Sequence, residues 1–183
     1  CVADVSGKGL PASLVMSNMQ ATLRALLGRE PSLPALAERA SDLLFASTAP
    51  EKYVTAALVD LEPRTGVFRF VGAGHVDTLI VRRSGEVVTL SSTGTPLGLM
   101  PPGLLFGEAE MTIERGDTLV LFSDGVTEAQ NREDEEYGEA RLVECIRGAQ
   151  GESCATTIDR IMASIDAFAG DAPQFDDITL LMA

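Results

Sequence analysis

Basic residues are scarce in this chain of 183 residues. Only 14 lysines and arginines stand against 27 aspartates and glutamates, which gives a formal net charge of −13. Because nucleic-acid phosphates are bound by basic surfaces, this deficit argues against a nucleic-acid-binding protein. The acidity is compatible with a cation site or a basic partner, and solubility alone would also explain it.

Cysteine and histidine, the usual zinc ligands, are also few. The three cysteines, Cys1, Cys145 and Cys154, form no C-x-x-C pair, and His75 is the single histidine. This set argues against a zinc site and a disulfide framework, and it favours a reducing compartment such as the cytoplasm. Cys145 falls within an apolar helical pattern and is expected in the core.

Long apolar runs are absent as well. No run approaches the ~20 residues that a helix needs to cross a bilayer, so we expect no membrane contact by this domain. The length and the 45% hydrophobic content suit one globular domain over residues 1–183. The chain opens on Cys1 rather than Met, inside an apparent strand, so we expect the N-terminal part of the domain to be missing.

The hydrophobic periodicity predicts helices alternating with short strands. Apolar residues at helical spacing predict helices over 11–27, 33–46, 139–147 and 154–168, the first two forming a hairpin. Runs rich in β-branched residues predict strands over 55–61, 67–71, 78–83, 86–90, 118–122 and 178–182. The almost wholly apolar runs 118–122 and 178–182 are typical of central, covered strands. The pattern indicates an α+β domain with a mainly antiparallel sheet.

Carboxylates recur where apolar strands meet loops. Asp4 follows the first apolar residues, Asp124 follows the run 118–122, and Asp176 and Asp177 precede the run 178–182. Acids gathered from three remote segments would repel one another unless a divalent cation lay between them, and oxygen ligands favour Mg²⁺ or Mn²⁺ over zinc. Taken singly, Asp124 before Gly125 is also a common turn, and Asp4 could cap the following helix.

The motifs that contain these acids resemble those of the metal-dependent, type 2C serine/threonine phosphatases. The similarity is greatest to the bacterial branch typified by stage II sporulation protein E and the sigma-factor regulatory phosphatases, and it covers essentially the whole chain. The matching stretches are DVSGKGLPASLVM (4–16), GAGH (72–75), GTPLGL (94–99), LFSDGVTEAQN (121–131) and DDITLL (176–181).

The resemblance implies a four-layer α-β-β-α sandwich of two antiparallel sheets flanked by helices, with two Mn²⁺ or Mg²⁺ ions. By this resemblance, Asp4 would bridge the two metals and the Val5 backbone carbonyl would ligate one of them. Asp124 and Asp176 would bind the other, and Asp177 occupies the neighbouring motif position. A metal-activated water, rather than a protein nucleophile, would attack the phosphorus.

The chain departs from the family pattern in two places. The family has a further metal-binding Asp in a Gly-Asp motif upstream of DVSGKG, and nothing precedes Cys1 in this sequence. One metal is therefore expected to be weak or absent in this fragment. In addition, Gly72 stands where the family usually has Asn, and Asp77 stands where Pro is common.

The expected function is a phosphatase acting on phosphoserine or phosphothreonine of a regulatory protein of the anti-sigma-factor-antagonist type. The domain would be the output end of a longer regulatory protein with a sensor domain. The hairpin 11–46 could serve regulation or dimerisation, or it could simply cover one sheet. The alternatives are a degenerate phosphatase that only binds its partner, and a small-molecule phosphohydrolase.

Lys8 could contact the substrate phosphate or be a solvated loop residue. His75 could be a general acid, although a structural role at a strand turn is favoured.

Overall fold

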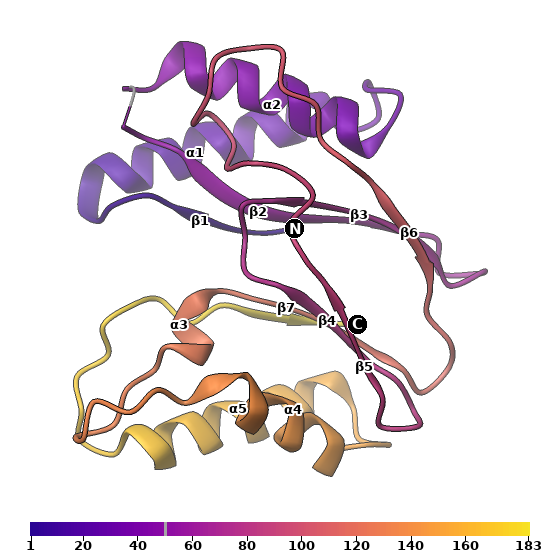
Figure 1. Ribbon diagram of the computed structural model, residues 1–183, viewed down its shortest axis with the longest axis vertical. Helices are drawn as coiled ribbons and strands as arrows, with labels where there is room; N and C mark the ends of the chain where they lie inside the picture. The colour runs from indigo at the N-terminus through magenta and orange to yellow at the C-terminus, as the bar shows by residue number, and fades with distance from the viewer. Residues whose placement is uncertain (50) are drawn as a thin grey trace. The chain divides into compact units, whose positions relative to one another are not determined.

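The computed structural model describes residues 1–49 and 51–183, and it divides into two compact units. The first unit comprises Cys1, Ala3–Asp77 and Leu90–Thr112, and the second comprises Val2, Thr78–Thr89 and Ile113–Ala183. Each unit contains a four-stranded sheet with helices packed on it (Figure 1). The predicted fold class, two antiparallel sheets flanked by helices, is confirmed.

The sheet of the first unit has the strand order β1-β2-β3-β6. Its strands are β1 (Val2–Val5), β2 (Val54–Leu61), β3 (Val67–Ala73) and β6 (Ala109–Thr112). The long central strands β2 and β3 pair antiparallel, with Leu58 opposite Val71. Both residues belong to the buried core of this unit, so the pairing register and the hydrophobic pattern agree.

Two helices, α1 (Gly9–Leu26) and α2 (Leu33–Ser47), form the predicted hairpin of the first unit (Figure 1). The Ser32 hydroxyl accepts a hydrogen bond from the Ala35 N–H and so caps α2. Helix α2 buries Leu36, Ala37, Ala40 and Leu44 and packs on β2 and β3. Helix α1 buries only Met19 fully, and it leaves leucines such as Leu10 largely exposed.

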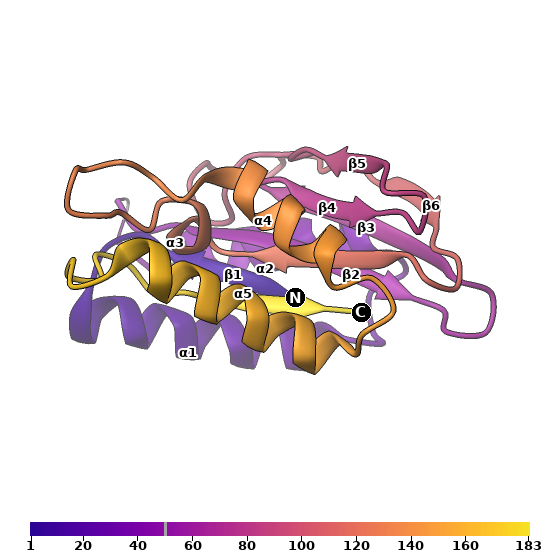
Figure 2. The same ribbon diagram turned by 90° about the horizontal axis from the view of Figure 1, so that it is seen from below.

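The sheet of the second unit has the strand order β5-β4-β7-β8. Its strands are β4 (Thr78–Val81), β5 (Val87–Leu90), β7 (Thr118–Phe122) and β8 (Leu180–Met182), and its helices are α3 (Asp124–Thr127), α4 (Gly138–Gly148) and α5 (Cys154–Ala169). The apolar run of β7 is buried between two neighbouring strands, as predicted. Helices α4 and α5 pack on each other and on this sheet (Figure 2).

Several sequence predictions need correction. The apolar run 178–182 is not a central strand, because β8 lies at the sheet edge and Leu181 is 39% exposed. Strand β6 and helix α3 were not predicted, since AEMT alternates weakly and DGVT is a single turn. Cys145 is only half-buried rather than in the core.

Among the described residues, none of the helices has the length and apolar character that crossing a membrane requires.

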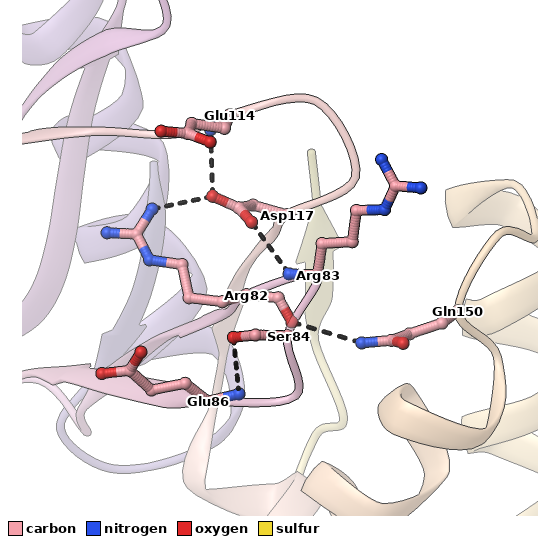
Figure 3. Close-up of polar contacts among 7 residues, drawn as sticks. All are labelled: Arg82, Arg83, Ser84, Glu86, Glu114, Asp117 and Gln150. Carbon is pink, nitrogen blue, oxygen red and sulfur yellow. Dashed lines mark hydrogen bonds and ion pairs between the residues drawn. The ribbon is translucent and has the colours of Figure 1, made fainter.

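A buried carboxylate anchors the β4–β5 turn of the second unit. The Asp117 side chain is 6% exposed and accepts hydrogen bonds from the Arg82 guanidinium (2.7 Å), the Arg83 N–H (2.9 Å) and the Glu114 N–H (3.0 Å) (Figure 3). Gln150 of the segment after α4 donates to the Arg82 carbonyl (3.2 Å). Burial alone would raise the pKa of Asp117, but these donors outweigh it and hold the pKa below its ordinary value.

We expect Asp117→Asn to lower the free energy of unfolding by about 1–3 kcal/mol at neutral pH, because it removes a charge that three donors stabilise. Since the folded-state pKa of Asp117 is depressed, its contribution is complete above the ordinary value of 3.8 and is lost below it, as the pH falls through the lowered pKa of the folded state. The difference between wild type and variant should therefore shrink toward about pH 3. Urea denaturation at both pH values measures this.

Asp171→Asn is the matched control for this prediction. Asp171 is also paired with an arginine, Arg132, but its side chain is 83% exposed. Exposed ion pairs contribute little, so this variant should change stability by less than about 0.5 kcal/mol. Equal effects of the two variants would contradict the role assigned to Asp117.

Candidate metal-binding site

The first predicted ligands lie at the end of strand β1. Asp4 lies inside β1 rather than after it, and Val5 is the buried last residue of that strand. The following loop is fixed by Ser6, whose N–H donates to the Tyr53 carbonyl (3.0 Å) and whose hydroxyl accepts from the Tyr53 N–H (3.0 Å). The N-cap of α1 is Lys8, so the alternative that Asp4 caps this helix is excluded.

A lysine that the sequence analysis missed contacts this loop. The Lys52 ammonium donates to the Ser6 carbonyl at 3.1 Å. Gly7 has φ +93°, and a Cβ at this position would lie 2.6 Å from the Lys52 Nζ. Gly7 is therefore required both by backbone conformation and by the close approach of the lysine. Lys8 is consequently not the only cation near Asp4, and no signal in the sequence links residues 46 positions apart.

The structure also shows the surroundings of Lys8 and His75, for which the sequence left two roles open each. Lys8 is exposed, and its side chain makes no capping hydrogen bond. His75 is 7% exposed, and its Nδ1 lies 2.9 Å from the Thr55 hydroxyl, which fits the favoured structural role. At Gly72 a Cβ would lie 2.7 Å from the Ser92 Cα, so a larger residue there would require the backbone to shift.

The second group of predicted ligands is held together by Ser123, directly before Asp124. The Ser123 hydroxyl donates to the Asp177 carbonyl (2.8 Å) and accepts from the Thr179 N–H (2.9 Å). The Ser123 N–H donates in turn to the Thr179 carbonyl (3.0 Å). These three hydrogen bonds form what we call the Ser123 clasp. It fixes the segment that carries Asp176 and Asp177 beside the start of α3.

The approach at the clasp is close enough to exclude a side chain at position 125. A Cβ on Gly125 would lie 2.4 Å from the Asp177 carbonyl oxygen and 3.4 Å from the Asp176 carbonyl carbon. Glycine is thus needed here for space between two backbones rather than for a turn. The predicted proximity of the SDG and DDIT motifs is confirmed at the level of the backbone.

Among the described residues, the carboxylates of Asp124 and Asp176 have no positively charged partner. One oxygen of Asp124 accepts from the Gly125 N–H (2.9 Å), and one oxygen of Asp176 accepts from the Asp177 N–H (2.8 Å). Within the described part of the chain, neither forms an ion pair with lysine, arginine or histidine. Glu128 is a further acid near these carboxylates that was not predicted from the sequence. Its pKa is raised, first by desolvation and then by the negative charge of neighbouring carboxylates, Asp124 foremost.

This donor set suits a hard divalent cation, because it is all oxygen and its charge is not neutralised. Asp124 and Asp176 each keep one carboxylate oxygen outside the hydrogen bonds named above. The described residues nevertheless include no group of three or more His, Cys, Asp or Glu side chains arranged around one metal position. The chemistry of the residues fits Mg²⁺ or Mn²⁺, whereas a complete coordination shell is not assembled among them.

Comparison with known sequences identifies relatives over most of the chain. The family described as stage II sporulation protein E (SpoIIE) matches residues 1–183. The phosphoserine phosphatase RsbU of Bacillus subtilis is 27% identical over 132 residues, which is 70% of this chain and 38% of that protein. The chain covers less than two fifths of the length of the curated relatives that it matches.

Solved structures show the same fold. The SiaA-PP2C domain of Pseudomonas aeruginosa superposes with a TM-score of 0.84 at 21% identity, over 98% of this chain and 72% of that one. The catalytic domain of the serine/threonine protein phosphatase PstP, solved with two manganese ions, gives a TM-score of 0.67 at 16% identity, over 98% of this chain and 84% of that one. At these identities the likeness establishes the architecture.

Proposed function

The chain belongs to the stage II sporulation protein E family, and from this we propose that it is a metal-dependent phosphatase of phosphoserine and phosphothreonine in proteins. The observation that carries the proposal is the Ser123 clasp, which brings two acid-bearing motifs together where no described lysine, arginine or histidine pairs with Asp124 or Asp176. A site of purely structural purpose would have no need to gather unpaired carboxylates, because their mutual repulsion lowers stability.

The proposed metal ligands are those predicted from the sequence: Asp4, the Val5 carbonyl, Asp124 and Asp176, with Asp177 as the weakest candidate. Two bound Mn²⁺ or Mg²⁺ ions would supply an activated water and bind the phosphate oxygens. The chain's own residues hold their carboxylates in place: Ser123 fixes the segment of Asp176, and the Gly125 N–H orients the Asp124 carboxylate. PstP, whose fold is similar, was solved with two manganese ions.

The proposed substrate and domain organisation are inferred from the relatives of the chain. RsbU is named a phosphoserine phosphatase, and a Mycobacterium tuberculosis protein of the same fold, 25% identical, joins RsbU and RsbW domains in one chain. We propose a phosphorylated regulatory protein of the anti-sigma-factor-antagonist type as substrate. We also propose that residues 1–183 form the catalytic output domain of a longer cytoplasmic protein that includes a sensor domain or forms a homodimer.

Release of inorganic phosphate from a phosphoserine protein tests this function. The assay compares residues 1–183 with the full-length protein, with Mn²⁺, with Mg²⁺ and with EDTA. We expect turnover that requires metal and is stronger in the full-length protein. A full-length protein that binds the phosphoprotein without turnover would instead favour the degenerate, partner-binding alternative.

Lys52 provides a further prediction about the proposed site. Lys52→Met keeps the aliphatic stem but removes the hydrogen bond to the Ser6 carbonyl, next to the proposed Val5 ligand. We expect the apparent metal affinity and kcat/KM to fall about tenfold, the usual scale for a residue that orients a ligand. Titration of activity with Mn²⁺ measures the effect.

Lys8→Met is the matched control, because Lys8 is exposed and lies in the same loop. It should change kcat/KM by less than about threefold, within the range of a solvated surface charge. Lys52→Arg should restore part of the lost metal affinity. If Lys8→Met were the more damaging variant, Lys8 rather than Lys52 would be the important cation of this loop.

A further inference from the structure

Helices α4 and α5 line an open surface pocket that plays no part in the proposed phosphatase site. The two helices run next to each other on the sheet of the second unit (Figure 2). The pocket has a volume of about 470 Å³, within the range of small-ligand sites. Its lining consists of Arg141, Glu144, Cys145, Gly148, Arg160 and Ser164.

One end of the pocket is rigidly built. Tyr137 is fully buried, and its hydroxyl lies 2.9 Å from the Ser164 hydroxyl across the two helices. The Arg141 guanidinium lies over the Phe168 ring, 4.5 Å from its centroid, and Phe168 packs edge-on against Tyr137. Arg141 also donates to the carbonyls of Tyr137 and Glu136, so its head group has a fixed position. A pre-positioned cation binds an anion at a lower entropic cost.

Both arginines retain donors that no described residue uses. The carbonyl contacts of Arg141 use one nitrogen, Nη1, and the ion pair of Arg160 with Glu152 uses Nη2. The other nitrogens of each guanidinium have no partner among the described residues. The Ser164 hydroxyl, which accepts from Tyr137, can donate its own hydrogen into the same pocket. Two guanidinium groups thus share one pocket, although Glu144 in its lining and Glu152, the ion-pair partner of Arg160, offset their charge.

Gly148 contributes no side chain to the pocket that it lines. It is the last residue of α4, and a Cβ built on it would meet no atom within 4 Å. Its φ does not lie in the left-handed region that favours glycine, so the backbone does not demand glycine here. A larger side chain at this pocket-lining position would therefore meet no steric obstacle at its Cβ.

We propose that the α4–α5 pocket binds a small oxyanion, a phosphate or carboxylate group, through Arg141, Arg160 and Ser164. Planar guanidinium groups match the geometry of these anions and bind them by charge-assisted hydrogen bonds. Glu144 lines the same pocket and weakens the attraction for an anion.

Titration of ¹⁵N-labelled protein with sodium phosphate, and separately with sodium acetate, at constant ionic strength tests the site. We expect saturable amide shifts at Cys145, Gly148 and Ser164 for at least one anion, and the pair of titrations separates a phosphate site from a carboxylate site. Sodium chloride is the reference titration. Absence of saturable shifts at these three residues with both anions would overturn the proposal.

Variants test whether the predicted groups bind the anion. Arg160→Gln should weaken binding about tenfold, because it removes a charged donor, and Gly148→Leu should abolish binding by filling the space. Glu144→Gln should tighten binding, an outcome that partial unfolding cannot produce. Arg132→Gln, an exposed arginine outside the pocket, and Asp124→Asn should leave binding unchanged. Wild-type binding by Gly148→Leu would contradict the proposed location.

Discussion

Asp124→Asn is expected to reduce metal-dependent phosphate release by roughly two to three orders of magnitude, because it removes a charged ligand from the proposed centre. The amide keeps an oxygen that can accept from the Gly125 N–H, so the start of α3 should stay folded. It lacks the negative charge that would hold a divalent cation. The loss should appear at every Mn²⁺ concentration at which the wild type is active.

The control for this variant is Asp159→Asn, an exposed aspartate on α5. It removes the same charge from the same unit and should leave turnover unchanged. Thermal unfolding with and without Mn²⁺ gives a second measurement: the metal should raise the midpoint of wild type more than that of Asp124→Asn. Turnover without metal, or full activity of Asp124→Asn, would refute the proposed mechanism.

Gly125→Ala should lower the free energy of unfolding by about 2–3 kcal/mol and reduce activity sharply, because the new methyl group overlaps backbone atoms. The Cβ would lie 2.4 Å from the Asp177 carbonyl oxygen, which cannot rotate away as a flexible side chain could. The segment 176–179 must therefore move away from α3, and the Ser123 clasp must lengthen. Urea denaturation and the phosphate assay measure the two effects.

Gly148→Ala is the matched control for the glycine change. Gly148 lies in a helix with open space around it, so alanine should be neutral or stabilise by up to about 1 kcal/mol. A Gly125→Ala protein with wild-type stability and activity would show that the segment around Asp177 adapts freely. The clasp would then not be what positions Asp176.

The sequence was most informative where several residues act together over a short span. The buried strand of β7, the helical hairpin and the five motifs could all be predicted, because periodicity and motif order are local properties. The motifs SDG (123–125) and DDIT (176–179) illustrate this. They were expected to lie close together, and the hydrogen bonds of the Ser123 clasp join them. Nothing in the two motifs specifies that a serine hydroxyl makes the connection.

The missed features depend on packing between distant residues. Lys52 reaches the loop after β1 from 46 residues away, and a single lysine in a loop has no distinguishing pattern. The apolar run of β8 predicted a central strand, but an edge position depends on how many strands the sheet has, which composition does not reveal. The sequence suggests that Gly125 belongs to an ordinary Asp-Gly turn. In the structure, glycine is needed at this position because the Asp177 backbone lies too close for a side chain.

The place of β8 in the sheet has a consequence for biosynthesis. On the ribosome, Ser123 emerges 56 residues before its partner Thr179, an interval of roughly 3–11 s at about 5–20 residues per second. During that time β7 exposes an unpaired edge of apolar residues, which is a template for pairing with another nascent chain. Slow translation between these positions, or a premature stop codon before residue 180, would therefore favour aggregation over a partly folded domain.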